Sequence, residues 1–85
     1  MQSLREHESI VEDLKDLFIF RTNINSRHNY AIVEGSLLQH RGVHACTIDL
    51  EDCDKVLRVE SENIPISVIV EEVVKLGFIC EELAD

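Results

Sequence analysis

The sequence is poor in the features that would place it among several common classes of small protein. No apolar run approaches the roughly 20 residues of a membrane helix, and the longest, 64–70, is interrupted by Pro65 and Ser67. The first residues do not combine a basic cluster with an apolar stretch, so we expect no secretory signal, no membrane insertion and a cytoplasmic location. Three cysteines, an odd number without close spacing, offer no disulfide framework.

Basic and aromatic residues are also scarce. Seventeen acidic against eight basic residues give a formal net charge of −9, and the aromatic residues are three Phe and one Tyr. This charge repels phosphate backbones and few rings remain for base stacking, so we predict no nucleic-acid binding. The same charge suits a cationic partner surface. No Ser/His/Asp order, glycine-rich phosphate loop or metal-hydrolase motif is present, and we do not expect an enzyme.

The sequence does contain two regions of different hydrophobic pattern. In residues 1–16, capping-box motifs begin at Ser3 and Ser9, and apolar residues recur at helical intervals. The pattern predicts an amphipathic helix over residues 3–15. Docking on the domain, pairing with a partner and fraying remain open for it. The apolar residues of this predicted helix are Leu4, Ile10, Val11 and Leu14.

Residues 17–85 alternate between strand and helix patterns. Strand alternation from Leu17 to Ile24 is followed by a helical pattern that begins near Tyr30 and ends before Gly42. Two strands come next, one burying Cys46, Ile48 and Leu50 and the other spanning 55–60. A second helix, with Pro65 in its first turn, ends at Gly77 and precedes a last strand over 78–83. This order predicts an α+β, ferredoxin-like βαββαβ sandwich with a four-stranded antiparallel sheet, plus the extra N-terminal helix.

Short motifs within residues 18–83 add a family resemblance. The segments Phe20-Arg-Thr-Asn-Ile-Asn, Gly42-Val43, Ile48-Asp49-Leu50 and Lys75-Leu-Gly77-Phe78 occur in the order and spacing of heavy-metal-associated domains. The chain therefore resembles this family, which includes copper chaperones and the N-terminal modules of metal-pumping ATPases. The resemblance implies that residues 22–29 correspond to the family's metal-binding loop.

The loop departs from the family at the two positions that matter most. Where the family has two cysteines separated by two residues, this sequence has Ser26 and Asn29. A hydroxyl and a carboxamide are poor ligands for Cu(I), which prefers thiolates, so we expect no bound cofactor. The alternative is a divalent or copper ion bound weakly by His28 and oxygen ligands. A single imidazole is more often a solvated loop residue than part of a metal site.

The three cysteines are expected to have other roles. The strand alternation turns Cys46 and Cys80 toward the helices, where free cysteine acts as a small hydrophobe. The predicted topology also puts their strands at opposite edges of the sheet. Cys53 lies between Asp52 and Asp54 in a polar turn, and we interpret it as an exposed surface thiol.

The resemblance also implies a surface for a partner protein, because relatives dock through the metal loop and the adjoining helix ends. Another protein, such as a metal-transport component, is the expected partner. Three further apolar residues, Ile32, Leu38 and Val74, exceed the needs of the core. They face either a partner or the N-terminal helix, and the alternative to a partner surface is a wider buried stripe under that helix. The predicted partner-binding residues are Arg27, His28, Tyr30, Lys75 and Phe78.

Overall fold

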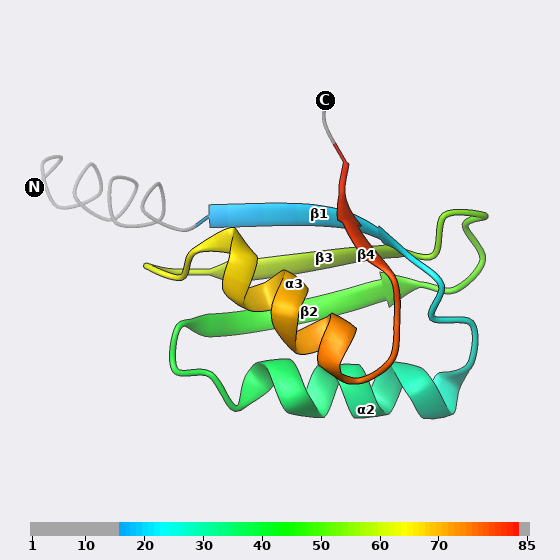
Figure 1. The fold of residues 1–85 in the computed structure, drawn as a ribbon, viewed down its shortest axis with the longest axis horizontal. Helices are drawn as coiled ribbons and strands as arrows, with labels where there is room; N and C mark the ends of the chain where they lie inside the picture. Colours follow the sequence, from blue (N-terminus) through cyan, green and yellow to red (C-terminus); the bar gives the residue numbers. More distant parts are fainter. Residues whose placement is uncertain (1–15, 84–85) are drawn as a thin grey trace, which may run out of the picture.

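The computed structural model describes residues 16–83, which form four strands and two helices (Figure 1). The predicted N-terminal helix over 3–15 lies outside the described residues. Neither described helix is long and apolar enough to cross a membrane. The elements are β1 (Asp16–Thr22), α2 (Arg27–Leu38), β2 (Val43–Asp49), β3 (Val56–Ser61), α3 (Ile66–Lys75) and β4 (Cys80–Glu82).

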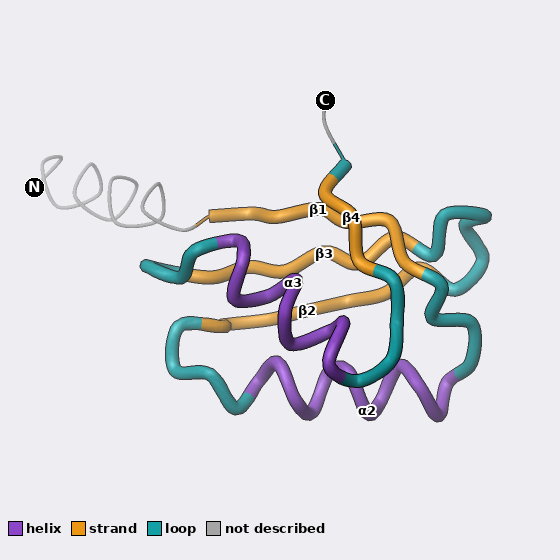
Figure 2. The backbone as a smooth tube through the Cα atoms, viewed as in Figure 1, coloured by secondary structure: helices purple, strands orange, loops and turns teal. Residues whose placement is uncertain are grey.

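The strands form one antiparallel sheet in the order β2-β3-β1-β4. Both helices cover the same face of this sheet (Figure 2). The βαββαβ sandwich predicted from the sequence is therefore confirmed for the described residues. Cys46 and Cys80 lie on strands at opposite edges, and both are free thiols.

The core lies between the sheet and the helices, and the strands supply most of its buried side chains. Phe20 and Ile24 are fully buried, and so are Leu57 and Val59 of β3. Leu50, which the strand pattern predicts to be buried, is only partly buried and packs against the margin of this core, as do Val70 and Leu76. The helices contribute the buried side chains Val33, Leu37, Ile69 and Val73.

Several element boundaries differ from the sequence prediction, three of them for reasons visible in the structure. Helix α2 begins at Arg27 rather than near Tyr30, because Ser26 provides an N-cap. Pro65 is the N-cap residue of α3, with an extended backbone, rather than a residue of its first turn. Strand β4 begins at Cys80 rather than at residue 78, because the backbone N–H of Ile79 is bonded to a side chain and not to a neighbouring strand.

Gly42 marks a close approach between two connections. A Cβ atom at this position would lie 2.5 Å from the carbonyl oxygen of Glu62 and 2.6 Å from Cγ1 of Ile64. The backbone N–H of Glu62 also donates to the carbonyl oxygen of Gly42 at 2.8 Å. Only glycine fits between the end of α2 and the connection that follows β3 without moving one of them.

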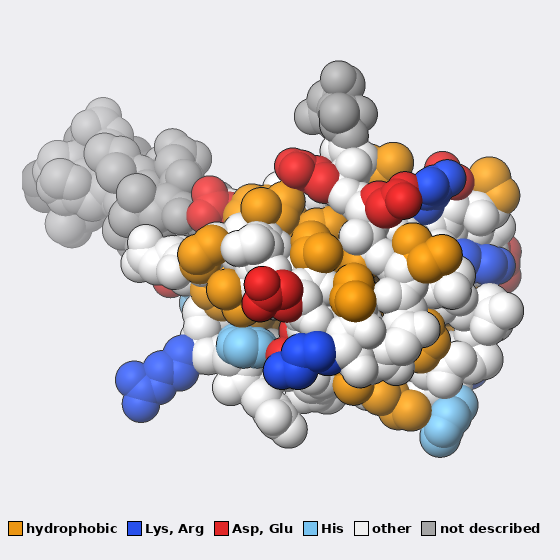
Figure 3. All heavy atoms as spheres, in the orientation of Figure 1, with side chains coloured by type: hydrophobic (Ala, Val, Ile, Leu, Met, Phe, Trp, Pro, Cys, Tyr) orange, Lys and Arg blue, Asp and Glu red, His pale blue; other side chains and the backbone are white. Residues whose placement is uncertain are grey.

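Several large apolar side chains remain exposed on the described domain. Ile32, Leu38 and Val74 are each more than 40% exposed, so they do not form a buried stripe within residues 16–83. In Figure 3, apolar side chains gather over α3 on the helical face. Leu17 and Ile79 are also exposed, at 57% and 50%. The domain thus presents apolar surface on more than one side.

Candidate functional site

The loop between β1 and α2 is attached to the β2–β3 turn through Thr22. The buried Thr22 hydroxyl donates to the carbonyl oxygen of Lys55 at 2.6 Å and accepts from the backbone N–H of Ile24 at 3.2 Å. Its backbone N–H donates to the carbonyl oxygen of Asp54 at 3.0 Å. The Ile24 side chain is fully buried in the core, so the loop is held by the core as well as by the β2–β3 turn.

A second bond attaches the same loop to the α3–β4 connection. The side-chain oxygen of Asn23 accepts from the backbone N–H of Ile79 at 2.9 Å. Phe78 packs its half-buried ring against the core, whereas the Ile79 side chain is exposed. Residues 23–26, 50–55 and 76–79 therefore meet at one end of the sheet, which we call the loop end (Figure 1).

Ser26 and Asn29, the two positions at which the sequence resemblance leads us to expect cysteine, are bonded to each other in this structure. Ser26 has an extended backbone (φ −143°, ψ 156°), and its hydroxyl oxygen accepts from the backbone N–H of Asn29 at 3.1 Å. Its carbonyl oxygen accepts from Tyr30 N–H at 2.9 Å. The first amides of a helix have no partner within the helix, and a serine N-cap satisfies one of them. Ser26 thus has a structural role, which the sequence signalled only as a serine before a helix.

The side chains near this loop do not assemble a ligand set for a soft metal ion. His28 is exposed, and within residues 16–83 it belongs to no group of three metal-ligating side chains. The one such group in that range is Asp52, Cys53 and Asp54, whose ligand atoms lie within 4.8 Å of one another. There the Asp52 carboxylate already accepts from Asp54 N–H at 2.8 Å, which accounts for the turn, and Cys53 is exposed as predicted.

The other two thiols are removed from metal chemistry by burial. Cys46 and Cys80 are 5% and 7% exposed. Burial raises the pKa of Cys46 to about 11, with a smaller contribution from the Glu34 carboxylate, and it raises the pKa of Cys80 to about 12. Both are therefore neutral thiols at pH 7. Their predicted role as small core hydrophobes is confirmed.

Three of the predicted partner-binding residues lie together at the start of α2. Arg27 and His28 are exposed, and Tyr30 is half-buried. Arg27 and Tyr30, with Ala31 and Glu34, line a shallow hollow of about 300 Å³ along the helix. The first turn of α2 carries no acidic residue, so Arg27 gives this part of an acidic protein a local positive charge.

Lys75 belongs to a different cluster. Its ammonium lies 4.0 Å from the Glu72 carboxylate, which also accepts a hydrogen bond from the Ser36 hydroxyl and lies 3.7 Å from His40. The Ser36 bond is the main reason that the pKa of Glu72 is lowered. This cluster joins α3 to the C-terminal half of α2. Ile79, which the sequence did not single out, is bonded to the loop instead.

The comparison with known proteins finds similarity in structure and none in sequence. No family model and no curated protein matches the chain. The yeast copper transporter domain Ccc2a has a TM-score of 0.71 at 24% identity, over 81% of this chain and 96% of that domain. The N-terminal domain of a potential copper-translocating P-type ATPase from Bacillus subtilis gives 0.71 at 18% identity, over 84% and 94%. The CopZ metallochaperone gives 0.70 at 18%, over 76% and 98%.

These matches extend over nearly the whole of each solved domain, so the common unit is the complete βαββαβ sandwich. Identities below 25% establish the fold and leave function to the residues of the site. At the loop, this chain has Ser26 and Asn29 and no pair of cysteines separated by two residues. The chain therefore has the fold of heavy-metal-associated, copper-chaperone-like domains without their paired loop cysteines.

Proposed function

We propose that this chain is a non-catalytic interaction module that keeps the heavy-metal-associated scaffold and binds another protein through its loop end. The observation that carries the proposal is the bond between Ser26 and Asn29. The Ser26 hydroxyl caps α2 at a position where the family resemblance would require a thiolate. The other position, Asn29, offers only an amide side chain. Such a loop is a poor carrier of Cu(I).

The loop end has the chemistry of a small recognition surface. Arg27 and His28 project from the start of α2, and the exposed Ile79 lies on the connection bonded to Asn23. A cation and an apolar side chain held by rigid elements are suited to a partner with an acidic and apolar patch. The solved domains of similar fold include copper-transporter domains, which supports a component of metal transport in the cytoplasm as the partner.

Photo-crosslinking with a matched pair of positions tests this surface. A photoreactive amino acid replaces His28 at the start of α2, or His44 near the start of β2, in the full chain. We expect one specific adduct from position 28 and none from position 44. Equal adducts from both positions, or no adduct from position 28 in cells that express the chain, would overturn the choice of surface.

Metal titration tests the lost site separately. Cu(I) and Zn(II) are added to the purified chain while the imidazole resonances of His28 are followed by NMR. We expect no tight one-to-one binding, because His28 belongs to no group of three potential ligands among the described residues. Saturation at one equivalent with a shift of the His28 ring would overturn the proposal. A shift of that ring that saturates only with excess metal would favour the alternative function, a weak or non-standard site built from His28 and oxygen ligands.

A further inference from the structure

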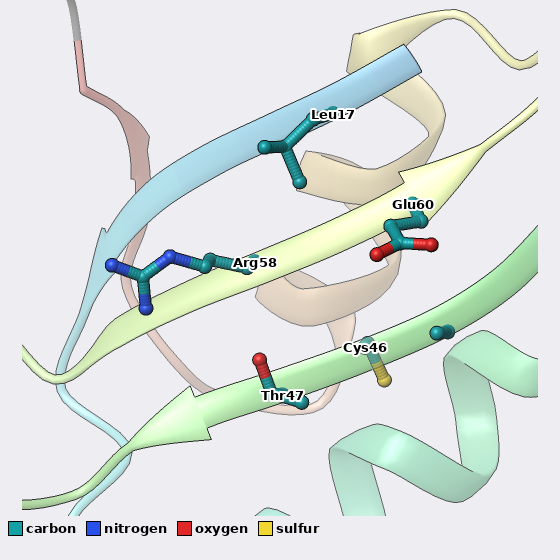
Figure 4. A pocket seen from close by; sticks show the side chains of 6 residues that line it. Leu17, Cys46, Thr47, Arg58 and Glu60 are labelled. Carbon is teal, nitrogen blue, oxygen red and sulfur yellow. The ribbon is translucent and has the colours of Figure 1, made fainter. Parts of the chain in front are cut away.

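The face of the sheet opposite the helices, which we call the open face, has a hollow of about 150 Å³ over β3. Figure 4 shows Leu17, Thr47, Arg58 and Glu60 on the side of the sheet away from α3. None of the roles described so far uses this hollow. The residues that line it are Leu17, Ala45, Cys46, Thr47, Arg58 and Glu60.

Two neighbouring rows of cross-strand partners on the open face each place a charged residue of β3 between side chains of β1 and β2. The first row, which we call the glutamate row, is Leu17, Glu60 and Ala45. The second, which we call the arginine row, is Ile19, Arg58 and Thr47. Within residues 16–83, neither charged residue takes part in an ion pair. Each row therefore has an unpaired charge at its centre and an apolar side chain on β1, and the two charges have opposite signs.

We infer that a second copy of this chain packs on the open face, related to the first by a two-fold axis that crosses the strands between the two rows. Such an axis reverses the direction of the strands and sets the glutamate row of each copy against the arginine row of the other. Glu60 then faces Arg58 of the other copy, and Leu17 faces its Ile19. The open face is thus complementary to itself in both charge and apolar contact.

The charges of β3 also select this axis over the other one that would bring two open faces together. A two-fold axis along the strands would set each row against the same row of the second copy. Arg58 would then face Arg58, and Glu60 would face Glu60. Like charges placed opposite each other in an interface are strongly unfavourable, so the pattern favours the axis across the strands.

The hollow provides a binding place for an arginine of the second copy. Its aliphatic stem can lie against Leu17 and Ala45 while its guanidinium reaches the Glu60 carboxylate, because arginine buries its methylene groups on apolar surface and still pairs its charge. Leu17 is the most exposed large hydrophobic side chain of the described domain, at 57%. The contact between two copies would remove this side chain from water.

The open face carries little of the negative charge of the chain. Its charged residues are two cations and three carboxylates, a formal sum of −1, whereas the whole chain carries −9. Charges on other surfaces that lie more than about 8 Å apart are largely screened at physiological ionic strength. Two copies therefore meet through their least repulsive face. The five charged residues are Arg21, Asp49, Arg58, Glu60 and Glu81.

The size of the face indicates that this association is weak. A strand of seven residues is about 23 Å long, and three spacings across the sheet add up to about 14 Å. Such a face provides less than the roughly 800 Å² per partner of a standard interface. Because the strands of the two copies run in opposite directions, their loop ends lie at opposite ends of the pair and stay free for a partner protein.

Sedimentation velocity of the full chain tests the inference over chain concentrations up to about 1 mM, with a reductant present because Cys53 is exposed. We expect the sedimentation coefficient to rise with concentration from that of a single chain toward that of a dimer. A constant value of a single chain would overturn the inference. Amide chemical shifts over the same series locate the contact, and we expect changes at Ile19, Ala45 and Arg58. Changes centred on Val74 of the helical face would also overturn it.

Charge reversal supplies the sharper test. Arg58→Glu and Glu60→Arg should each weaken self-association by more than about tenfold, because like charges then face each other twice. A mixture of these two single variants should associate again, since each meets opposite charges on the other, and so should the variant with both changes. Single variants that still self-associate, or a mixture that does not, would overturn the two-fold arrangement.

A control separates local pairing from the net charge of the chain. Arg41→Glu changes the formal charge by the same amount as Arg58→Glu, at an exposed position in the α2–β2 connection. We expect it to associate like the parent chain, and an equal loss of association would overturn the assignment to Arg58 and Glu60. Far-ultraviolet circular dichroism verifies that each variant is folded.

Discussion

Replacing Ser26 by alanine tests whether the Ser26 side chain stabilises the start of α2 as an N-cap. The hydroxyl accepts the Asn29 amide at 3.1 Å, and no acidic residue in the first turn of α2 compensates for its loss. Removing a serine N-cap costs about 1 kcal/mol, within a range of about 0.5–2 kcal/mol. In a domain of this size, about 1 kcal/mol lowers Tm by about 4–8 °C. We therefore expect Ser26→Ala to lower the free energy of unfolding by about this amount.

Asn29→Ala is the matched control for this change. Asn29 contributes its backbone N–H to the cap, and alanine retains that group. Because alanine is also the better helix former, we expect a change within about 0.5 kcal/mol, if anything toward higher stability. Urea denaturation followed by far-ultraviolet circular dichroism gives both midpoints, and an unchanged m value shows that they report stability. If Ser26→Ala is as stable as Asn29→Ala, the cap argument is wrong.

Restoring both cysteines extends the same test to the metal site. The double variant Ser26→Cys with Asn29→Cys should lose the cap when metal is absent, because sulfur is a weak acceptor. We expect it to gain Cu(I) binding. Free Cu(I) at 1,000 times the dissociation constant then stabilises the domain by about 4 kcal/mol, more than the cap contributed. A folded double variant that binds no Cu(I) would mean that residues 26 and 29 do not occupy the family's metal positions.

The fold was predictable because burial imposes a period on the sequence. The alternation that places Phe20 and Ile24 in the core, and the helical spacing that places Val33 and Leu37 there, are both visible without a structure. The strand order could also be predicted, because βαββαβ in so short a chain leaves few topologies.

The finer features depend on contacts between residues far apart in the sequence. Periodicity extended the last strand to residue 78, but the Asn23 side chain takes the Ile79 amide from 56 positions away. Lys75, a predicted partner-binding residue, lies 4.0 Å from the Glu72 carboxylate, and that carboxylate also accepts from the Ser36 hydroxyl of the other helix. The bonds of Asn23 to Ile79 and of Ser36 to Glu72 have no signal within a local window, because both join segments far apart in the sequence.

The interpretation of the loop changed for a related reason. Comparison with the family emphasises the absence of cysteine at residues 26 and 29. It does not indicate any role for the serine and asparagine that occupy these positions. The structure shows that Ser26 stabilises the start of α2. That position therefore has a structural use in this chain, and we expect its replacement by cysteine to have an energetic cost. Under the proposed function, the absence of a thiolate and the stability of the scaffold are coupled at this one side chain.

A pair of glycines and the buried thiols provide two further tests. Gly42→Ala should destabilise the domain by about 1–3 kcal/mol through overpacking, whereas Gly35→Ala, with open space around its Cβ position, should stabilise α2 by up to about 1 kcal/mol; equal effects in urea denaturation would contradict the close approach. At pH 8 a thiol reagent should modify only Cys53 in the native chain and three cysteines in denaturant. The pKa values of Cys46 and Cys80 are raised to about 11 and about 12, so the unfolded chain releases these protons first as pH rises. The free energy of unfolding should therefore be unaffected by these thiols below about pH 8.5 and fall between about pH 9 and 12, by the order of a few kcal/mol. Replacing both cysteines by alanine should make this decrease in the free energy of unfolding with pH smaller than in the parent chain. An equal decrease in both chains, measured by urea denaturation across this pH range, would refute its assignment to the buried thiols.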